Sequence, residues 1–156
     1  ELYYARYNDI VVALRESKGV KTFYRHRSPR ALLQQLRKGA LVGILADQDI
    51  ESVEGVFVDF FGKPAYTPTG PASLALHAGV PIVMSFVVRE SKRSYRLFVD
   101  KVIEGRRLHH ESKAEAVERI TREWRSVVEN NIKRYSDQWM WMHDRWKTKP
   151  PVVSAP

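Results

Sequence analysis

The sequence predicts an α/β fold with a mostly parallel or mixed sheet flanked by helices. Apolar runs of strand length alternate along the chain with helical segments of about ten residues, a pattern typical of βαβ units. The chain has 156 residues, of which 44% are hydrophobic and 28% charged. Length and composition therefore indicate one globular domain of ordinary size.

The first half of the chain predicts two helices and two strands. An amphipathic helix covers residues 6–18, and a short strand is expected at 20–24. Ser28 is a good N-cap and Pro29 a good first-turn residue for a helix at 30–38. The run ALVGILA, at 40–46, has the pattern of a buried strand that leads directly into an acidic loop.

The second half predicts further strands and a long helix. In order, we expect a strand at 55–61 within a long loop at 47–69, a helix from Gly70 that ends at Gly79, strands at 80–90 and 94–102 joined by a turn, and a helix from Ser112 to Arg134. A short helix is expected near the end. We assign 1–149 to the domain and 150–156 to a mobile tail.

Charge favours an anionic partner. There are 26 Lys and Arg residues against 18 Asp and Glu, a net charge of +8, and the pI is about 9.8. Nucleic acid, anionic lipid, phosphates and an acidic carrier protein are the partner classes that such a charge attracts. The bases gather between Arg15 and Lys38, whereas the segment from Asp47 to Gly62 holds acids and no base.

Several chemistries are excluded by what the sequence lacks. There is no cysteine, so disulfides and thiol catalysis are excluded, and the five histidines show no zinc spacing. No phosphate-binding Gly-rich motif, nucleophile elbow or signal peptide is visible. The longest apolar run, Val80 to Val88, is far shorter than the roughly 20 residues of a spanning helix.

Two short stretches have the chemistry of a site. Asp47, Gln48 and Asp49 follow a predicted strand at the edge where α/β folds hold ligands, although a polar loop with Asx turns explains them too. In the stretch PTGPA, Thr69 or Gly70 can cap a helix whose free N–H groups suit an anion. Many ordinary helices begin in the same way.

His110 and Glu115 have the spacing of a base and its orienting acid. However, Ser112 and Glu115 also form Ser-x-x-Glu, the signature of a capping box at a helix start. The box already accounts for Glu115, so we interpret this pair as structural.

The stretch DQWMWMHDRWKTKP, from Asp137 to Pro150, combines aromatic and basic residues. If it is helical, Trp139, His143 and Trp146 share one face, which suits the protein's core. The remaining aromatic and basic side chains suit a membrane–water interface, namely Trp141, Arg145 and Lys147.

These stretches together resemble a known family. LVGILADQDI, GVFVDFFGKPAYTPTGPASLAL, GVPIV and SDQWMWMHDRWKTKP resemble the lauroyl/myristoyl acyltransferases of lipid A biosynthesis, within the lysophospholipid and glycerol-phosphate acyltransferase superfamily. The resemblance covers about residues 6–150. GVKTFYR and VPIV also resemble superfamily elements, although Met84 stands where a second proline is common.

The resemblance implies an acyltransferase-like fold and an O-acyl transfer, part of lipopolysaccharide biosynthesis. A fatty acyl chain would move from an acyl carrier protein thioester to a hydroxyl of a phosphorylated glycolipid, a lipid A precursor. The family's catalytic His-x4-Asp/Glu pair lies ahead of the matched region, so we expect no catalytic residue here and no activity from this C-terminal part alone. No cofactor, metal or nucleic acid is implied. The implied location is the cytoplasmic face of the bacterial inner membrane, peripheral or anchored through a preceding segment.

The resemblance also implies roles for individual residues. The expected supporting residues are Asp47, Gln48 and Asp49. The expected substrate-binding residues are Arg25, Phe60, Phe61, Gly62, Thr67, Thr69, Gly70, Pro71, His143, Arg145, Trp146 and Lys147.

Two other functions fit the sequence. A basic nucleic-acid-binding module would explain the charge and the aromatics, and it predicts salt-sensitive binding to DNA or RNA. A relative that kept the fold but lost catalysis would bind anionic lipid without turnover.

Overall fold

The computed structural model describes residues 4–24 and 29–151, in two compact units, Glu1–Val42 and Gly43–Pro156. In the first unit, α1 (Ala5–Glu16) and α2 (Pro29–Arg37) confirm the two predicted helices. The expected cap residue Ser28 and the expected binding residue Arg25 lie outside the described residues.

Two predicted strands are wrong. Residues 20–24 and 40–46 are extended or irregular, and neither pairs with another strand in the described part of the chain. The side chains of Leu41 and Leu45 are 92% and 88% exposed. Apolar runs of this kind form strands only where a neighbouring strand satisfies their backbone groups, because burial without such pairing leaves N–H and C=O unsatisfied.

The second unit begins with a hairpin of β1 (Gly55–Phe60) and β2 (Lys63–Pro68). Its two-residue turn is Phe61-Gly62, with φ of 53° and 75°, the positive values that a type I′ turn requires. Only β1 was predicted. The prolines at 64 and 68 lower the strand propensity of β2, yet an edge strand tolerates them.

A second hairpin follows α3 (Gly70–Ala78), which confirms the predicted helix and ends at Gly79 with φ of 66°. Strands β3 (Ile82–Arg89) and β4 (Tyr95–Ile103) confirm the two strands expected at 80–102, and they pair antiparallel with an irregularity between Met84 and Ser85. The side chains on one face of this hairpin pack toward the core, while those on the other face are exposed.

The mixed α/β class is confirmed, but the expected parallel pairing is not found. Both sheets of the described residues have two antiparallel strands, β1-β2 and β3-β4. Antiparallel strands can be joined by short turns, whereas a parallel pair needs a crossover connection. The run at 40–46, which suggested a parallel neighbour, has no strand partner.

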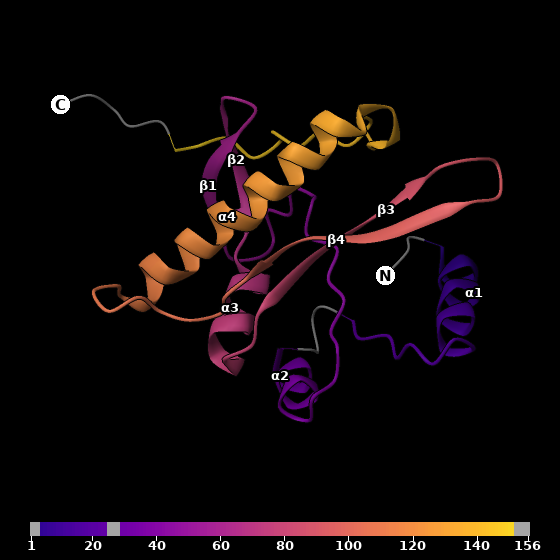
Figure 1. Cartoon of the computed structure of the whole chain (residues 1–156), viewed down its shortest axis with the longest axis horizontal. Coiled ribbons are helices and arrows are strands. Elements are labelled where there is room, and N and C mark those ends of the chain that lie inside the picture. Colours follow the sequence, from indigo (N-terminus) through magenta and orange to yellow (C-terminus); the bar gives the residue numbers. More distant parts are fainter. Residues whose placement is uncertain (1–3, 25–28, 152–156) are drawn as a thin grey trace. The chain divides into compact units, whose positions relative to one another are not determined.

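The long helix α4 (Lys113–Arg134) organises the core of the second unit (Figure 1). It contacts α3, β1 and β4. The core combines Ile120, Trp124 and Val128 of this helix with Phe60 of β1 and Ile103 of β4. Ser112 and Glu115 form the predicted capping box, since each side chain bonds the backbone N–H of the other residue.

The final segment is not the helix that its apolar spacing suggested. A 3-10 helix, η2 (Ser136–Gln138), is followed by turns and irregular chain. Trp139, His143 and Trp146 therefore do not share a helical face. In place of helical hydrogen bonds, the backbone N–H of Trp141 donates to the carbonyl of Trp139, and that of His143 donates to the carbonyl of Met140. Side chains of the segment also form hydrogen bonds with residues far away in the sequence.

In the stretches that the structure describes, no helix is both long enough and apolar enough to cross a membrane.

Candidate functional site

The terminal segment folds back onto the acidic loop, and Asp49 joins them. The backbone N–H of Asp49 donates to His143 Nε2 over 3.1 Å. Its carboxylate accepts from the backbone N–H and the hydroxyl of Thr148, at 2.8 and 2.7 Å. Asp49 is buried. Because Nε2 of His143 accepts a hydrogen bond, this geometry assigns the ring proton to Nδ1.

Arg145 joins the terminal segment to the first hairpin. Its guanidinium donates to the carbonyl of Tyr66 over 2.6 Å and to the hydroxyl of Thr67 over 2.7 Å. The side chains of Arg145 and Thr67 are buried. Burial lowers the pKa of Arg145, and the charges of Asp49 and Asp47 oppose that shift.

An aromatic cluster lies beneath these contacts. The Phe60 ring stacks on Trp146 with centroids 5.4 Å apart, and it meets Phe61 edge-on at 4.6 Å. The guanidinium of Arg145 lies 5.5 Å from the Phe60 centroid. The structure thus brings the expected residues Phe60, Phe61, Thr67, Arg145 and Trp146 into one cluster.

Sequence reasoning missed Arg125, a second arginine in this cluster. Its guanidinium lies 3.0 Å from the Phe60 centroid, it is 1% exposed, and its three nitrogen atoms have no hydrogen-bond partner among the described residues. Burial, with the nearby charge of Arg145, lowers the pKa of Arg125 to about 8. The available signal was a base on the apolar face of α4, next to Trp124.

The turn and helix residues of the site have structural partners. The backbone N–H of Phe61 donates to Glu129 Oε2 over 3.0 Å, and that of Gly62 donates to Asp59 Oδ1 over 3.2 Å. Thr69 is the N-cap residue of α3, one of the two predicted alternatives, but its hydroxyl makes no capping bond and donates to the carbonyl of Glu54 instead. Gly70 and Pro71 form the first turn of α3.

The accessible part of this region is a shallow cavity of about 490 Å³ beside the acidic loop. Its lining residues are Asp49, Ile50, Glu51, Ser52 and Lys147. Gln48 is exposed nearby along the chain, and Asp47 is half-buried. Of the expected site residues, Gln48, Gly62, Gly70 and Lys147 are exposed, whereas Phe60, Thr67, Thr69 and Arg145 are enclosed.

His110 and Glu115 do not form a base–acid pair in this structure. Glu115 accepts the backbone N–H of Ser112 over 2.7 Å, and that bond lowers the pKa of the Glu115 carboxyl. The His110 ring instead meets the ring of His109 edge-on, with centroids 4.7 Å apart. In addition, no group of three or more metal-ligating side chains occurs in the part of the chain that the structure describes.

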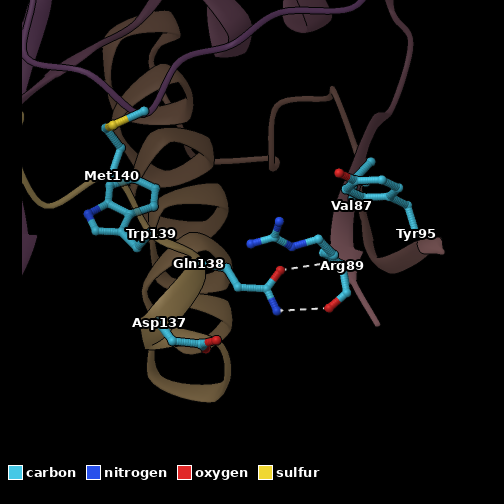
Figure 2. Close-up of a pocket in the computed structure, with 7 residues that line it drawn as sticks. All are labelled: Val87, Arg89, Tyr95, Asp137, Gln138, Trp139 and Met140. Carbon is cyan, nitrogen blue, oxygen red and sulfur yellow. Dashed lines mark hydrogen bonds between the residues drawn. The ribbon is translucent and has the colours of Figure 1, made fainter. Parts of the chain in front are cut away.

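A second cavity, of about 360 Å³, lies between the β3–β4 hairpin and the residues that follow α4 (Figure 2). Its lining residues are Val87, Arg89, Tyr95, Asp137, Gln138, Trp139 and Met140. Gln138 holds the backbone of Arg89 by two bonds, accepting from the N–H at 2.8 Å and donating to the carbonyl at 3.2 Å. No motif in the sequence indicates a role for Arg89.

Fold and site together define a mixed α/β protein whose terminal segment is fastened to an acidic loop and to a hairpin. Residues 3–148 match the family model described as bacterial lipid A biosynthesis acyltransferase. The chain belongs to this family.

Individual relatives agree with that membership. The chain is 29% identical over 128 residues to the lipid A biosynthesis palmitoleoyltransferase of Escherichia coli K12, and equally to the lipid A biosynthesis acyltransferase of Shigella flexneri. A 52-residue stretch, 33% of this chain and 16% of the relative, is 40% identical to a phosphatidylinositol mannoside acyltransferase of Mycobacterium tuberculosis strain CDC 1551 / Oshkosh. The first two matches cover 81% of this chain but 40% of each relative, so the chain spans less than half of their length.

Proposed function

We propose that the protein to which these residues belong is an O-acyltransferase. It moves a fatty acyl chain from an acyl carrier protein thioester to a hydroxyl of a phosphorylated glycolipid, a lipid A precursor. The observation that carries the proposal is the family match over residues 3–148. The structure supports it by bringing the acidic loop, the first hairpin and the terminal block together.

The reaction needs a general base that this chain does not supply. A base removes the proton of the acceptor hydroxyl, the oxygen attacks the thioester carbonyl, and the carrier's thiol leaves with a proton. Of the five histidines, only His110 has an acid four intervening residues later, and that acid, Glu115, is used in the capping box. We therefore propose that the general base lies in a part of the protein outside these 156 residues.

In this proposal, the residues of the candidate site support the reacting groups and bind the acceptor lipid. Asp47, Gln48 and Asp49 form the acidic loop that supports the reacting groups. Asp49 also fixes His143 and Thr148 of the terminal block. Arg25, which lies outside the described residues, and Lys147 are the proposed contacts for acceptor phosphates, because a cation near a phosphate forms a charge-assisted hydrogen bond.

The hairpin and helix residues hold these contacts in place. Phe60, Phe61 and Trp146 pack together beneath the terminal block, and Arg145 fastens it to Thr67. Gly62 forms the hairpin turn, while Thr69, Gly70 and Pro71 begin α3. Their proposed contribution to substrate binding is the placement of the first turn of α3, whose N–H groups suit an anion.

A second glycolipid acceptor is a specific alternative. The similarity to a phosphatidylinositol mannoside acyltransferase covers 52 residues, and the named substrate of that relative is not lipid A. The net charge of +8 favours any acidic partner, including a carrier protein and an anionic membrane surface. The proposed location is the cytoplasmic face of the inner membrane, where both lipid precursors and carrier proteins are accessible.

Acyl transfer by the purified 156-residue chain tests this assignment. Acylated carrier protein and a lipid A precursor are supplied, with His110→Ala as the control, and product is followed by mass spectrometry. We expect no turnover from either form, with turnover appearing in a longer polypeptide that contains the upstream pair. Turnover by this chain that disappears in His110→Ala would contradict the capping-box assignment. Transfer by the longer polypeptide to a mannoside lipid alone would favour the second acceptor.

A further inference from the structure

The second cavity carries an inference that deepens, and rests on, the proposed acyltransferase function. We propose that the cavity around Arg89 binds the phosphate of an anionic lipid, whose hydrocarbon chains lie along the exposed face of the β3–β4 hairpin. The surface thereby defines a lipid-binding site separate from the acidic loop.

Arg89 is the cation of this site. Its side chain is exposed and forms no ion pair with any described residue, although the neighbouring base Arg96 is paired with Glu90. Figure 2 shows its guanidinium extending from the hairpin toward Trp139. Asp137 also lines the cavity, but it forms no ion pair with Arg89. The guanidinium is therefore available to an incoming anion.

The backbone of Arg89 is held before any ligand arrives. The two hydrogen bonds from the Gln138 amide fix both the N–H and the carbonyl of Arg89. Gln138 belongs to η2, directly before Trp139 and Met140 of the same cavity. A fixed backbone loses less conformational freedom on binding, which favours affinity.

The exposed face of the hairpin supplies apolar surface. Alternate residues of β3 and β4 point away from the core, and six of them are large apolar side chains between 45% and 69% exposed: Val83, Val87, Tyr95, Leu97, Val99 and Val102. Val87 pairs with Leu97, and Arg89 pairs with Tyr95. The apolar row therefore runs directly into the cavity. An exposed apolar surface of this extent marks an interaction site.

Charge and composition favour a lipid over other partners. Arg89 lies at the end of the apolar row and lines the cavity. Trp139 and Tyr95 line the same cavity as Arg89. Aromatic rings beside apolar surface and a base are typical of sites at a lipid–water boundary. Nucleic-acid surfaces are polar instead, without an apolar row of this kind.

Calorimetric titration of the 156-residue chain with dihexanoyl phosphatidic acid, below its micelle concentration, tests the proposal. We expect Arg89→Gln to weaken binding about tenfold, since it removes a charge-assisted hydrogen bond. Leu97→Gln, a change at an exposed position, should weaken it severalfold through lost apolar contact. Arg93→Gln is the matched control, an exposed base of the same hairpin outside the cavity, and should change the affinity less than about twofold.

Two further probes distinguish the source of the phosphate. Inorganic phosphate and dihexanoyl phosphatidylcholine should each bind at least tenfold more weakly than the phosphatidic acid. If inorganic phosphate binds as tightly as the phosphatidic acid, the cavity is a site for free anions. If Arg93→Gln weakens lipid binding as much as Arg89→Gln does, the attraction is unspecific. Either result, or no binding by the unmodified chain, overturns the proposal.

Binding is measured without turnover, so the two proposals fail separately. Absent acyl transfer in the longer polypeptide leaves a measured lipid affinity intact. Two results together would support both proposals: Arg89→Gln loses lipid binding, and acyl transfer by the longer polypeptide requires the upstream His-x4-Asp/Glu pair. Amide shifts of Arg89 and Gln138 on titration, followed by NMR, locate the bound lipid at this cavity.

Discussion

At the scale of single residues, the two buried arginines differ in how they are satisfied. Arg145 donates to Tyr66 and Thr67, whereas Arg125 has only the face of Phe60 and the field of nearby acids. A cation–π contact contributes on the order of 2 kcal/mol when desolvated. The desolvation of an unpaired guanidinium is larger, as the lowered pKa of Arg125 indicates. We therefore expect the charge of Arg125 to lower the stability of the fold.

Arg125→Met should therefore raise the free energy of unfolding at pH 7 by about 1–3 kcal/mol, because it keeps the volume and removes a buried charge. The gain should shrink above pH 8. The folded-state pKa of Arg125, about 8, is below its ordinary value, so between those values the unfolded state binds more protons and the unmodified protein becomes more stable as pH rises. Urea unfolding at pH 7 and pH 9 measures both effects.

Arg122→Met is the matched control for that comparison. Arg122 is an exposed residue of the same helix and is paired with Glu118, so its replacement should change stability by less than about 0.5 kcal/mol at either pH. A loss of stability in Arg125→Met would show that the Phe60 contact outweighs the desolvation of the guanidinium.

At the scale of elements, the first hairpin depends on an unusual turn sequence. A type I′ turn needs positive φ at both central positions, which Asn-Gly supplies without strain. Here Phe61 holds φ of 53°. Its ring packs on Phe60 and its N–H bonds Glu129, so tertiary contacts offset the cost of the left-handed conformation. Gly62 holds the second position, at φ of 75°.

Gly62→Ala should lower the free energy of unfolding by about 1 kcal/mol. A Cβ at this position meets nothing within 4 Å, so the effect comes from the positive φ alone. Gly43→Ala is the control, because it too would meet nothing and its φ lies outside the left-handed region. Thermal unfolding of both variants makes the comparison. Equal stabilities would mean that the turn relaxes to another type.

At the scale of the whole molecule, burial is concentrated in the second unit. Among the described residues, the buried hydrophobic ones lie between Val58 and Ile132, and Asn8 is the one buried residue before Val42. Apolar burial is the main favourable term in folding, so the free energy that opposes local opening is larger in the second unit than in the first.

Limited trypsin digestion should therefore cut before Gly43 earlier than within α4. Mass spectrometry should show a persistent fragment that begins after Arg37 or Lys38 and retains α4, because cleavage requires local opening of the chain. Heat-unfolded protein, digested in parallel, shows the order in which trypsin cuts these sites when no folded structure protects them. Cuts within α4 at the earliest times would contradict this distribution of stability.

The helices were largely predictable from local sequence. Gly79 ends α3, and the Ser112–Glu115 box begins α4. These signals act over three or four residues, so they need no knowledge of the rest of the molecule. The β3–β4 hairpin was predictable for the same reason, since its two apolar runs are separated only by a short polar turn.

What depended on distant contacts was not predictable. The strand expected at 40–46 has no partner, and the terminal block, helical by its spacing, is held by Asp49 and by Tyr66 and Thr67 across 78 to 99 residues of sequence. Family membership and the list of site residues came from motifs in the sequence alone. Tertiary structure alone decided that Arg125 is buried without a partner and that Arg89 faces a cavity, because burial and cavities arise from segments that meet only in the folded chain.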